Sequence, residues 1–426
     1  MSKVDDLQLL KDFLALFDTT LNADAQTHLQ QILSTPLDSV EAIVERQHIL
    51  QEIINSGLCS VYSYQKTDYS EVFYFLNLLD NQYFKETDYL TSLFQRRNNN
   101  RLIGHYIQLA YYFTEIEKIL HACITIKKFP VTYQQDLRFI FNYIGAFQFR
   151  KYKKQLAKGT LNHAAIQFMN KLVLEKRKRG DTARFYSLLN RLEAYIAVAA
   201  GIKKMNFVFP HFGTKGFEIQ GAYHPLLSNP VKNDINIQSG MLLLTGANMS
   251  GKSTFLKSFG IIVYLAHLGM AVPAGYSSLP FFEYITVHIN HSDNIKNGLS
   301  HFMQEIVNMK EVLQKMKEGR RCFAIFDELY KGTNYEDALQ ISKWTLEGLR
   351  QHEGSFFLIS THLYALKDSF DHAEGISAFH LDCRVEDNIP QFTYKLREGW
   401  TNLKIGELLF KREGLSELLQ TNYHYT

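Results

Sequence analysis

Residues 245–254 read Thr-Gly-Ala-Asn-Met-Ser-Gly-Lys-Ser-Thr and decide how the fold of this 426-residue chain is interpreted. Positions 246–253 satisfy the pattern G-x-x-x-x-G-K-[ST], which binds phosphate groups between a strand and a helix. The apolar run Met241–Thr245 before it predicts a buried strand, and residues 252–268 after it have the periodicity of a helix. The pattern therefore lies in the context that it requires, and it predicts an ATP site with Mg²⁺ as cofactor.

The residues of this loop have distinct expected roles. Backbone N–H groups turn toward phosphate oxygens, and the following helix adds partial positive charge at its N-terminus. Lys252 is expected to neutralise the β and γ phosphates and so to take part in catalysis, while the Ser253 hydroxyl is a hard oxygen ligand that suits Mg²⁺. The ATP-binding residues expected from the pattern are Gly246, Ala247, Asn248, Met249, Ser250, Gly251, Lys252, Ser253 and Thr254.

Two later apolar runs, at 322–326 and 356–360, also end in polar residues. After the first, Asp327 is expected to hold Mg²⁺, directly or through water, and Glu328 to orient and deprotonate the attacking water. After the second, His362 is expected to sense the γ-phosphate. A D-E pair is equally typical of a helix cap, and a lone histidine usually lies on the surface. The agreement in the order of elements favours the functional interpretation.

The two halves of the chain differ in pattern. Up to about residue 205, apolar residues recur three and four positions apart, as at Val40, Ile43 and Val44, which predicts long helices. Tripeptides such as NNN at 98–100 predict turns between them. From residue 206 onward, short apolar runs alternate with helical segments, which predicts a largely parallel sheet covered on both faces. The predicted fold class is therefore mixed, all-α and then α/β.

Composition excludes several classes of protein. Hydrophobic residues make up 46% and charged residues 21%, which is typical of a folded globular chain. Four cysteines without a C-x-x-C pair favour neither a disulfide framework nor a zinc site. The N-terminus lacks the pattern of a secretion signal, and no apolar segment approaches the ~20 residues of a membrane helix. A soluble, cytoplasmic protein without a membrane partner is expected.

The charge is concentrated in one region. Residues 148–204 contain fourteen Lys or Arg against three acidic residues, although the whole chain carries only +3. Such a segment could follow a phosphate backbone, or its charges could be spread over solvated helix surfaces. The candidate DNA contacts are Lys151, Lys153, Lys154, Lys176, Arg177, Lys178 and Arg179.

Three motifs together resemble the ATPase domain of the MutS family of DNA mismatch-repair proteins, a branch of the ABC ATPases. They are TGANMSGKSTFLK (245–257), FDELYKGTN (326–334) and STH (360–362), within a resemblance that covers most of 221–415. Residues 35–53 also resemble a segment of the family's core domain. The resemblance implies a helical core and lever domain, 1–205, that runs into an ABC-type P-loop ATPase domain, 206–426.

The resemblance also implies a partner. The segment 293–305 is similar to the family's signature loop, whose serine completes the ATP site of the opposite subunit. Ser300 would therefore act in trans, and the working unit would be a homodimer joined through its ATPase domains. DNA, double-stranded or branched, would be its other partner.

Some features of the family's mismatch-repair members are not expected. The core-like segment starts near residue 35, which leaves no room for the mismatch-reading and connector domains, and the clamp would be reduced or absent. The strings at 113–115 and 281–283 match the family's Phe-x-Glu wedge by chance. The segments DELYKGTN (327–334) and YKLREGW (394–400) resemble those of a group of short bacterial MutS-like proteins whose role is not settled. The leading hypothesis is a dimeric ATPase that couples ATP binding and hydrolysis to DNA clamping, in repair or recombination. The alternative is an ABC-type ATPase switch that acts on a protein partner and binds no DNA.

Overall fold

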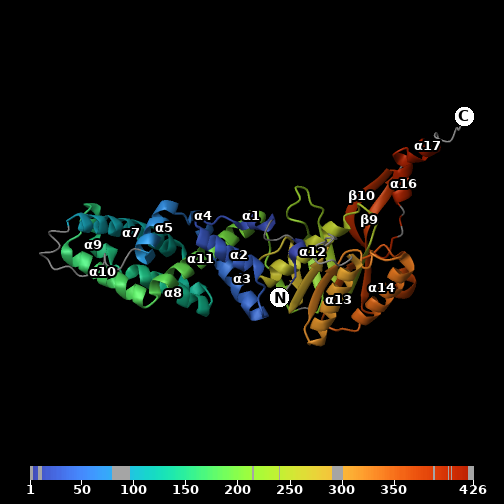
Figure 1. The fold of residues 1–426 in the computed structure, drawn as a ribbon, viewed down its shortest axis with the longest axis horizontal. Helices are drawn as coiled ribbons and strands as arrows, with labels where there is room; N and C mark the ends of the chain where they lie inside the picture. The colour runs from blue at the N-terminus through green and yellow to red at the C-terminus, as the bar shows by residue number, and fades with distance from the viewer. Residues whose placement is uncertain are drawn as a thin grey trace. The chain divides into compact units, whose positions relative to one another are not determined.

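The computed structural model describes residues 3–7, 12–78, 96–213, 215–238, 240–289, 301–386, 389–401, 403 and 405–420. The chain forms two compact units. The helical unit consists of Phe13–Thr35 and Val44–Lys204, and the α/β unit consists of Met1–Asp12, Pro36–Ile43 and Met205–Thr426. A helical N-terminal region followed by α/β sheets confirms the predicted mixed fold class (Figure 1).

The division differs from an uninterrupted helical domain 1–205. Met1–Asp12 and Pro36–Ile43 fall in the α/β unit, because backbone hydrogen bonds tie their residues to strands and helices there. The Lys3 N–H donates to the Ile285 carbonyl at 3.0 Å, and the Leu37 N–H donates to the His267 carbonyl at 2.9 Å. Hydrogen bonds over such sequence distances leave no local pattern, so the prediction missed them.

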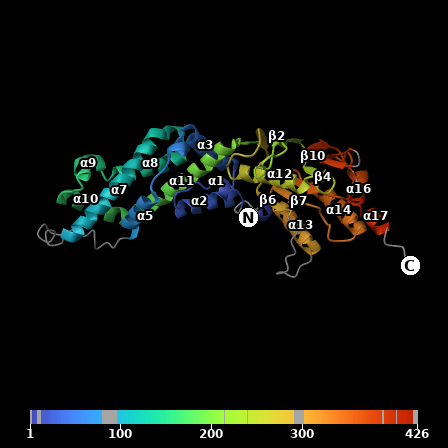
Figure 2. The same ribbon diagram turned by 90° about the horizontal axis from the view of Figure 1, so that it is seen from above.

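The helical unit has a core rich in aromatic side chains. The rings of Tyr143 and Phe185 stack with centroids 4.2 Å apart, and Phe113 lies across both. These three residues belong to α8, α11 and α7, which run alongside one another (Figure 2). The described helices that lie wholly or mostly in this unit are α1 (Leu14–Phe17), α2 (Ala23–Ser34), α3 (Val40–Asn55), α4 (Leu58–Val61), α5 (Lys66–Phe73), η3 (Tyr74–Leu78), α7 (Arg96–Cys123), η5 (Ile126–Lys128), α8 (Val131–Gly145), α9 (Phe149–Ala157), α10 (His163–Lys178) and α11 (Asp181–Met205).

The predicted turn at 98–100 is wrong, because the three asparagines lie inside α7. This helix buries Leu102, Tyr106 and Leu109, which recur three and four residues apart. Burial of such a face stabilises a helix more than the modest preference of asparagine for turns destabilises it. Tertiary packing therefore stabilises helical structure in a segment whose local sequence favours a turn.

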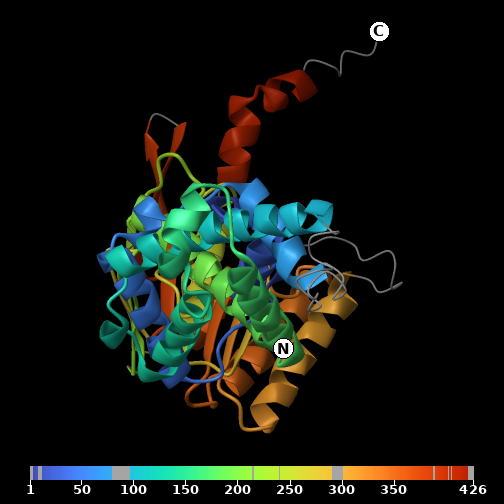
Figure 3. The same cartoon turned by 90° about the vertical axis from the view of Figure 1, so that its left-hand side faces the viewer.

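The α/β unit contains two sheets, whose strands are ordered β10-β9-β4-β8-β7-β6 and β1-β5-β2-β3. In the six-stranded sheet all neighbours are parallel except β10, which runs antiparallel to β9. The strands are β1 (His211–Phe212), β2 (Phe217–Ala222), β3 (Asn233–Ile237), β4 (Met241–Thr245), β5 (Tyr276–Leu279), β6 (Tyr284–His288), β7 (Cys322–Phe326), β8 (Phe356–Ser360), β9 (Ile376–Glu386) and β10 (Ile389–Glu398). The β9–β10 hairpin stands out in red in Figure 3.

The three strands expected from apolar runs are confirmed as the fully buried strands β4, β7 and β8. They lie side by side in the order β4-β8-β7 and are parallel, so their carboxyl ends reach one edge of the sheet. Ligands of open parallel sheets bind at this edge. The three motifs of the sequence therefore converge there.

Helices cover both faces of this sheet, as the alternating pattern predicts. On one face α13 (His301–Lys317) and α14 (Tyr335–Leu349) contribute Val312 and Leu346 to a core that includes Leu243 of β4. On the other face lies α12 (Lys252–His267), whose Phe259 ring stacks on Phe323 of β7. The remaining helices of the unit are η1 (Asp5–Leu7), η7 (Tyr364–Leu366), α15 (Lys367–Phe370), α16 (Ile405–Arg412) and α17 (Leu415–Gln420).

Within the described part of the chain, no helix combines the length and the apolar character that crossing a bilayer requires.

One buried histidine should make the stability of the protein depend on pH. His267 is fully buried in α12, with Nδ1 2.7 Å from the Val263 carbonyl and Nε2 accepting from the Phe282 N–H at 2.9 Å. Burial lowers the pKa of His267 to about 4, while in the unfolded chain it is near 6.5. Below pH 6.5 the unfolded state therefore binds more protons, and stability falls as pH drops from 6.5 to 4.

We expect His267→Leu to flatten this dependence, although it lowers stability at pH 7 by removing two hydrogen bonds. In the native protein, His267 should lower the free energy of unfolding by about 3 kcal/mol as the pH falls from 6.5 to 4. Unfolding followed at pH 4.5, 5.5 and 7 measures it, with His372→Asn as control because that side chain is exposed. Equal slopes for His267→Leu and the native protein would contradict the assignment.

Candidate functional site

The phosphate-binding pattern forms the loop between β4 and α12. Gly246 and Gly251 both have positive φ, of 147° and 96°, which a residue with a side chain rarely adopts. A Cβ at Gly246 would lie 2.8 Å from the Ser250 hydroxyl, so the loop leaves no room for one. The Ser250 Oγ is itself buried without a hydrogen-bond partner among the described residues. The backbone conformation of the loop therefore requires glycine at these two positions.

Lys252 begins α12 and folds back over the loop. Its Nζ donates to the carbonyls of Gly246 at 3.0 Å and Ala247 at 3.2 Å, and the side chain is buried. Burial lowers the pKa of Lys252, and the carboxylates of Glu328 and Asp327 oppose that shift. A cation is thus held directly over the loop, where phosphate oxygens would neutralise it.

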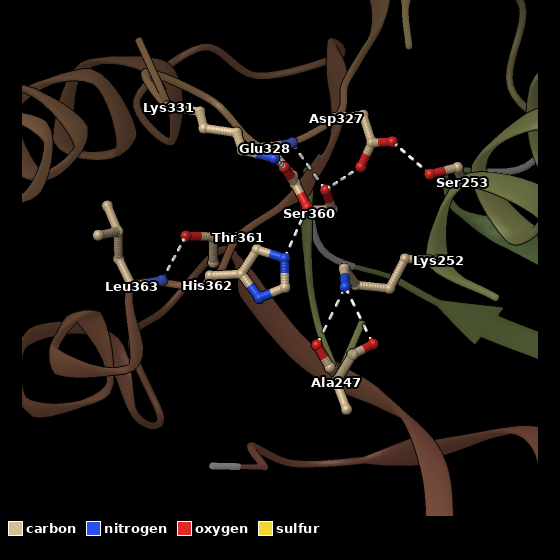
Figure 4. A network of polar contacts seen from close by, with 11 residues as sticks. Ala247, Lys252, Ser253, Asp327, Glu328, Lys331, Ser360, Thr361, His362 and Leu363 are labelled. Atoms are coloured by element: carbon tan, nitrogen blue, oxygen red, sulfur yellow. Dashed lines mark hydrogen bonds and ion pairs between the residues drawn. The ribbon is translucent and has the colours of Figure 1, made fainter. Parts of the chain in front are cut away.

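Asp327 connects two strands and the loop. The Ser253 hydroxyl donates to Asp327 Oδ2 at 2.6 Å, and the Ser360 hydroxyl donates to Oδ1 (Figure 4). The Ser253 hydroxyl and the Asp327 carboxylate are hard oxygen donors in direct contact, which fits Mg²⁺. Among the described residues no group of three or more His, Cys, Asp or Glu is placed to hold a metal. A magnesium ion would therefore take its other ligands from phosphate and water.

Glu328 lies one residue beyond Asp327, and both of its carboxylate oxygens are engaged. His362 Nε2 lies 2.6 Å from Oε1, and the Lys331 ammonium donates to Oε2. The hydrogen bond from His362 contributes most to lowering the pKa of Glu328 to about 2, and Lys331 adds to it. The carboxylate is therefore ionised, so the imidazole must be the donor in this contact. Figure 4 shows His362 and Glu328 facing one another.

The backbone at Glu328 is unusual. Its φ is 55°, in the left-handed region, and its N–H donates to the Ser360 hydroxyl at 2.8 Å. Ser360 thus fixes both members of the acidic pair, since its hydroxyl also donates to Asp327. Strained backbone held by its surroundings is typical of functional sites.

A cavity of about 290 Å³ adjoins the loop. Its walls are largely apolar and aromatic, and they come from the β2–β3 region, the start of α12 and strand β10. Lining residues include Ala222, Tyr223, Gly251, Phe255, Asn233 and Tyr394. The Tyr394 ring lies over the loop, where a Cβ at Gly251 would come within 3.0 Å of its Cδ1. Such a cavity has the character of a small-molecule site.

The structure brings together most of the predicted site residues. Lys252 and Ser253 lie beside Asp327, Glu328 and His362 at the edge formed by β4, β8 and β7. Their roles remain predictions, and Ser300 lies outside the described residues. Tyr394 and Lys331 also lie at the site and were not predicted from the sequence. In the sequence, Tyr394 is marked only as an aromatic residue within the apolar segment FTYKL, and Lys331 only as a basic residue three positions after Glu328.

Two of the predicted DNA contacts on α10 also make contacts within the helical unit. The Lys176 ammonium lies 4.4 Å from the centroid of the Tyr143 ring, and burial lowers its pKa. Arg177 donates to the carbonyls of Leu76 at 2.6 Å and Phe75 at 2.7 Å. These two cations stabilise the helical unit. Sequence spacing alone does not distinguish them from their exposed neighbours Lys178 and Arg179.

The contacts predicted on α9 are exposed. Phe149 and Tyr152 are buried, while Lys151, Lys153 and Lys154 are exposed. Because residues of an α-helix are ~100° apart around its axis, Lys151 and Lys154 lie opposite the buried pair. A basic face therefore exists on α9.

Comparison with known proteins agrees with this geometry. Residues 242–415 match the family model described as MutS domain V. The DNA mismatch repair protein MutS of Lactococcus lactis subsp. cremoris (strain MG1363) is 30% identical over 258 residues, which are 57% of this chain and 30% of that protein. The DNA mismatch repair protein MutS of Persephonella marina (strain DSM 14350 / EX-H1) is 30% identical over 246 residues, 56% of this chain and 28% of that protein. The matches confirm the resemblance to the MutS ATPase domain, and the chain spans less than a third of either relative.

Proposed function

We propose, from the premise that residues 242–415 form a MutS domain V, that this protein binds and hydrolyses ATP and couples this cycle to DNA clamping as a dimer. One observation supports the ATPase most. The loop lysine, the Ser253–Asp327 pair and the Glu328–His362 pair meet at the carboxyl ends of three adjacent parallel strands. This arrangement supports the ABC-type P-loop ATPase domain that the sequence predicts.

The loop and its lysine would bind the triphosphate. Loop N–H groups and the N-terminus of α12 would face the phosphate oxygens, and the Lys252 ammonium would exchange the carbonyls of Gly246 and Ala247 for the β and γ phosphates. Ser253 and Asp327 would hold Mg²⁺, which would supply positive charge to offset the negative charge of the phosphates. The nucleobase would occupy the 290 Å³ cavity and stack on Tyr394.

Glu328 would act on the attacking water. The water oxygen would bond to the γ-phosphorus as the bond to the leaving oxygen of ADP breaks, and the water proton would pass to the Glu328 carboxylate. A carboxylate already bound by His362 and Lys331 has to exchange one of these contacts for the water. The released His362 would then be free to contact the γ-phosphate.

The dimer and its second site rest on the family resemblance. Ser300 of one copy would complete the ATP site of the other, so that closure of the two α/β units depends on bound ATP. The helical unit would transmit this closure to double-stranded or branched DNA. A switch that acts on a protein partner without DNA is the alternative, and the structural roles of Lys176 and Arg177 favour it by reducing the basic surface.

The α9 face gives a test of DNA binding. We expect Lys151→Gln with Lys154→Gln to weaken binding to duplex and branched DNA and to reduce the slope of log affinity against log salt by about 2, since each phosphate contact contributes ~0.9. Fluorescence anisotropy at several salt concentrations measures both quantities, with and without ATP.

The matched control removes the same charge elsewhere. Lys127 and Lys128 are exposed in the same unit, so Lys127→Gln with Lys128→Gln should leave the slope unchanged. Equal effects of the two pairs would indicate nonspecific attraction. No binding by the native protein at low salt would exclude DNA clamping and leave the protein-partner alternative.

A further inference from the structure

We propose that Asn233 is a positioning residue that fixes the aromatic wall of the nucleobase cavity by holding a bulge in β10. This inference rests on the proposed function, because it assigns the cavity to the base of ATP. It concerns a residue that makes no contact with the phosphates and that no motif of the sequence includes.

The bulge interrupts the pairing of β10 with β9. Phe392 pairs with Cys383 and Leu396 with Leu381, so four steps along β10 oppose two along β9. Tyr394 lies within the bulge at a φ of 55°. A residue with a side chain is uncommon in this left-handed region, and surrounding contacts have to hold it there.

The side-chain amide of Asn233 makes those contacts. Its Nδ2 donates to the Tyr394 carbonyl at 3.0 Å, and its Oδ1 accepts from the Leu396 N–H at 2.9 Å. One buried amide therefore binds the backbone on both sides of Lys395, as a neighbouring strand would. Asn233 is the first residue of β3, which belongs to the other sheet, so this contact joins the two sheets at the cavity.

The position of the bulge determines where the Tyr394 ring lies. The ring approaches the phosphate loop at Gly251 and forms part of the cavity wall. If the bulge relaxed toward ordinary strand geometry, the side chain would change direction, because successive residues of a strand point to opposite faces. The base would then lose its stacking surface, while the phosphate loop would stay as it is.

The next residue, Asp234, holds a second irregular strand at the cavity. Asp234 Oδ1 accepts from the Gly221 N–H at 2.7 Å, and Gly221 has a φ of 64° at a register shift in β2. This shift directly precedes Ala222 and Tyr223, which also line the cavity. The two adjacent side chains at the start of β3 thus hold both irregular strands that bound it.

The test separates the base from the phosphates by using two ligands, Mg-ATP and magnesium tripolyphosphate, which lacks a base. We expect Asn233→Leu to weaken ATP binding about tenfold, the scale of losing one base–aromatic stack. Tripolyphosphate affinity and the turnover rate at saturating ATP should stay within about twofold, so that KM rises while kcat holds. Isothermal titration calorimetry and phosphate-release kinetics give these values.

Three further variants keep the test specific. Asn233→Asp retains the shape and the acceptor but loses the donor to the Tyr394 carbonyl, so it should also weaken ATP binding and serves if the leucine variant fails to fold. Asn236→Leu, at an exposed position of the same strand, should have no effect. In a Tyr394→Ala background, Asn233→Leu should add no further loss, because it acts through that ring.

The outcomes are distinguishable. Native affinity for ATP in both Asn233 variants would overturn the inference and leave the proposed function intact. Equal losses for ATP and tripolyphosphate would also overturn it, since they would show a general structural role. A native protein that binds neither ligand would overturn the proposed function and this inference together.

Discussion

Replacing Glu328 by glutamine should lower the rate of ATP hydrolysis by about 10²–10⁴-fold, the range of a general base in catalysis, while ATP remains bound. Glutamine has nearly the same shape and still offers an oxygen to His362, but it cannot take up the proton of the attacking water. Its loss of charge also removes the ion pair with Lys331. Because the phosphate loop is unchanged, ATP affinity should remain near that of the native protein.

Single-turnover phosphate release and equilibrium binding of ATP together test this result. Glu336→Gln is the matched control, because Glu336 is exposed in the first turn of α14 and should leave both quantities unchanged. If Glu328→Gln hydrolysed ATP at the native rate, the assignment of Glu328 as the base would be wrong. The P-loop itself would not be affected by that outcome.

Replacing Lys252 by methionine should weaken ATP binding by at least about tenfold, because charge-assisted hydrogen bonds to the phosphates are worth roughly 1.5–3 kcal/mol. Turnover should fall as well, since the same charge stabilises the transferred phosphoryl group. Methionine retains the unbranched stem that fills the buried position. The folded state should not be destabilised much, because burial disfavours the charged lysine, as its lowered pKa indicates.

Calorimetric titration with Mg-ATP and a thermal unfolding curve check the two expectations in parallel. Lys310→Met is the control, as Lys310 is exposed on α13. A large drop in the unfolding midpoint of Lys252→Met would contradict the expected independence of folding. Unchanged ATP affinity would exclude the loop as the phosphate site.

The different outcomes of these two substitutions would show at which step of ATP binding and hydrolysis each residue acts. Lys252→Met should act on binding, and Glu328→Gln on the chemical step alone. The two residues are 76 positions apart in the sequence, yet their charges interact in the folded protein. This proximity follows from the adjacency of β4, β8 and β7 in one parallel sheet.

The sequence by itself determined the elements that carry the candidate site. Strands β4, β7 and β8 are buried along their whole length, so each appears as a continuous apolar run that local pattern recognises. The phosphate loop is likewise predicted from local sequence, because its glycines, lysine and serine lie at fixed spacing within one short segment. The mixed fold class also followed from local periodicity.

Only the tertiary structure decided which distant residues complete the site. Asn233 and Tyr394 are 161 residues apart, and Arg177 reaches the Leu76 carbonyl across 101 residues. The residues that neighbour these side chains in the sequence give no indication of such a contact. The same holds for the assignment of Met1–Asp12 to the α/β unit. Local sequence determines the backbone preferences of a segment. Hydrogen bonds between remote segments form only when the whole chain packs. These hydrogen bonds decide which lysines, arginines and asparagines, among those with similar local sequence, stabilise the fold.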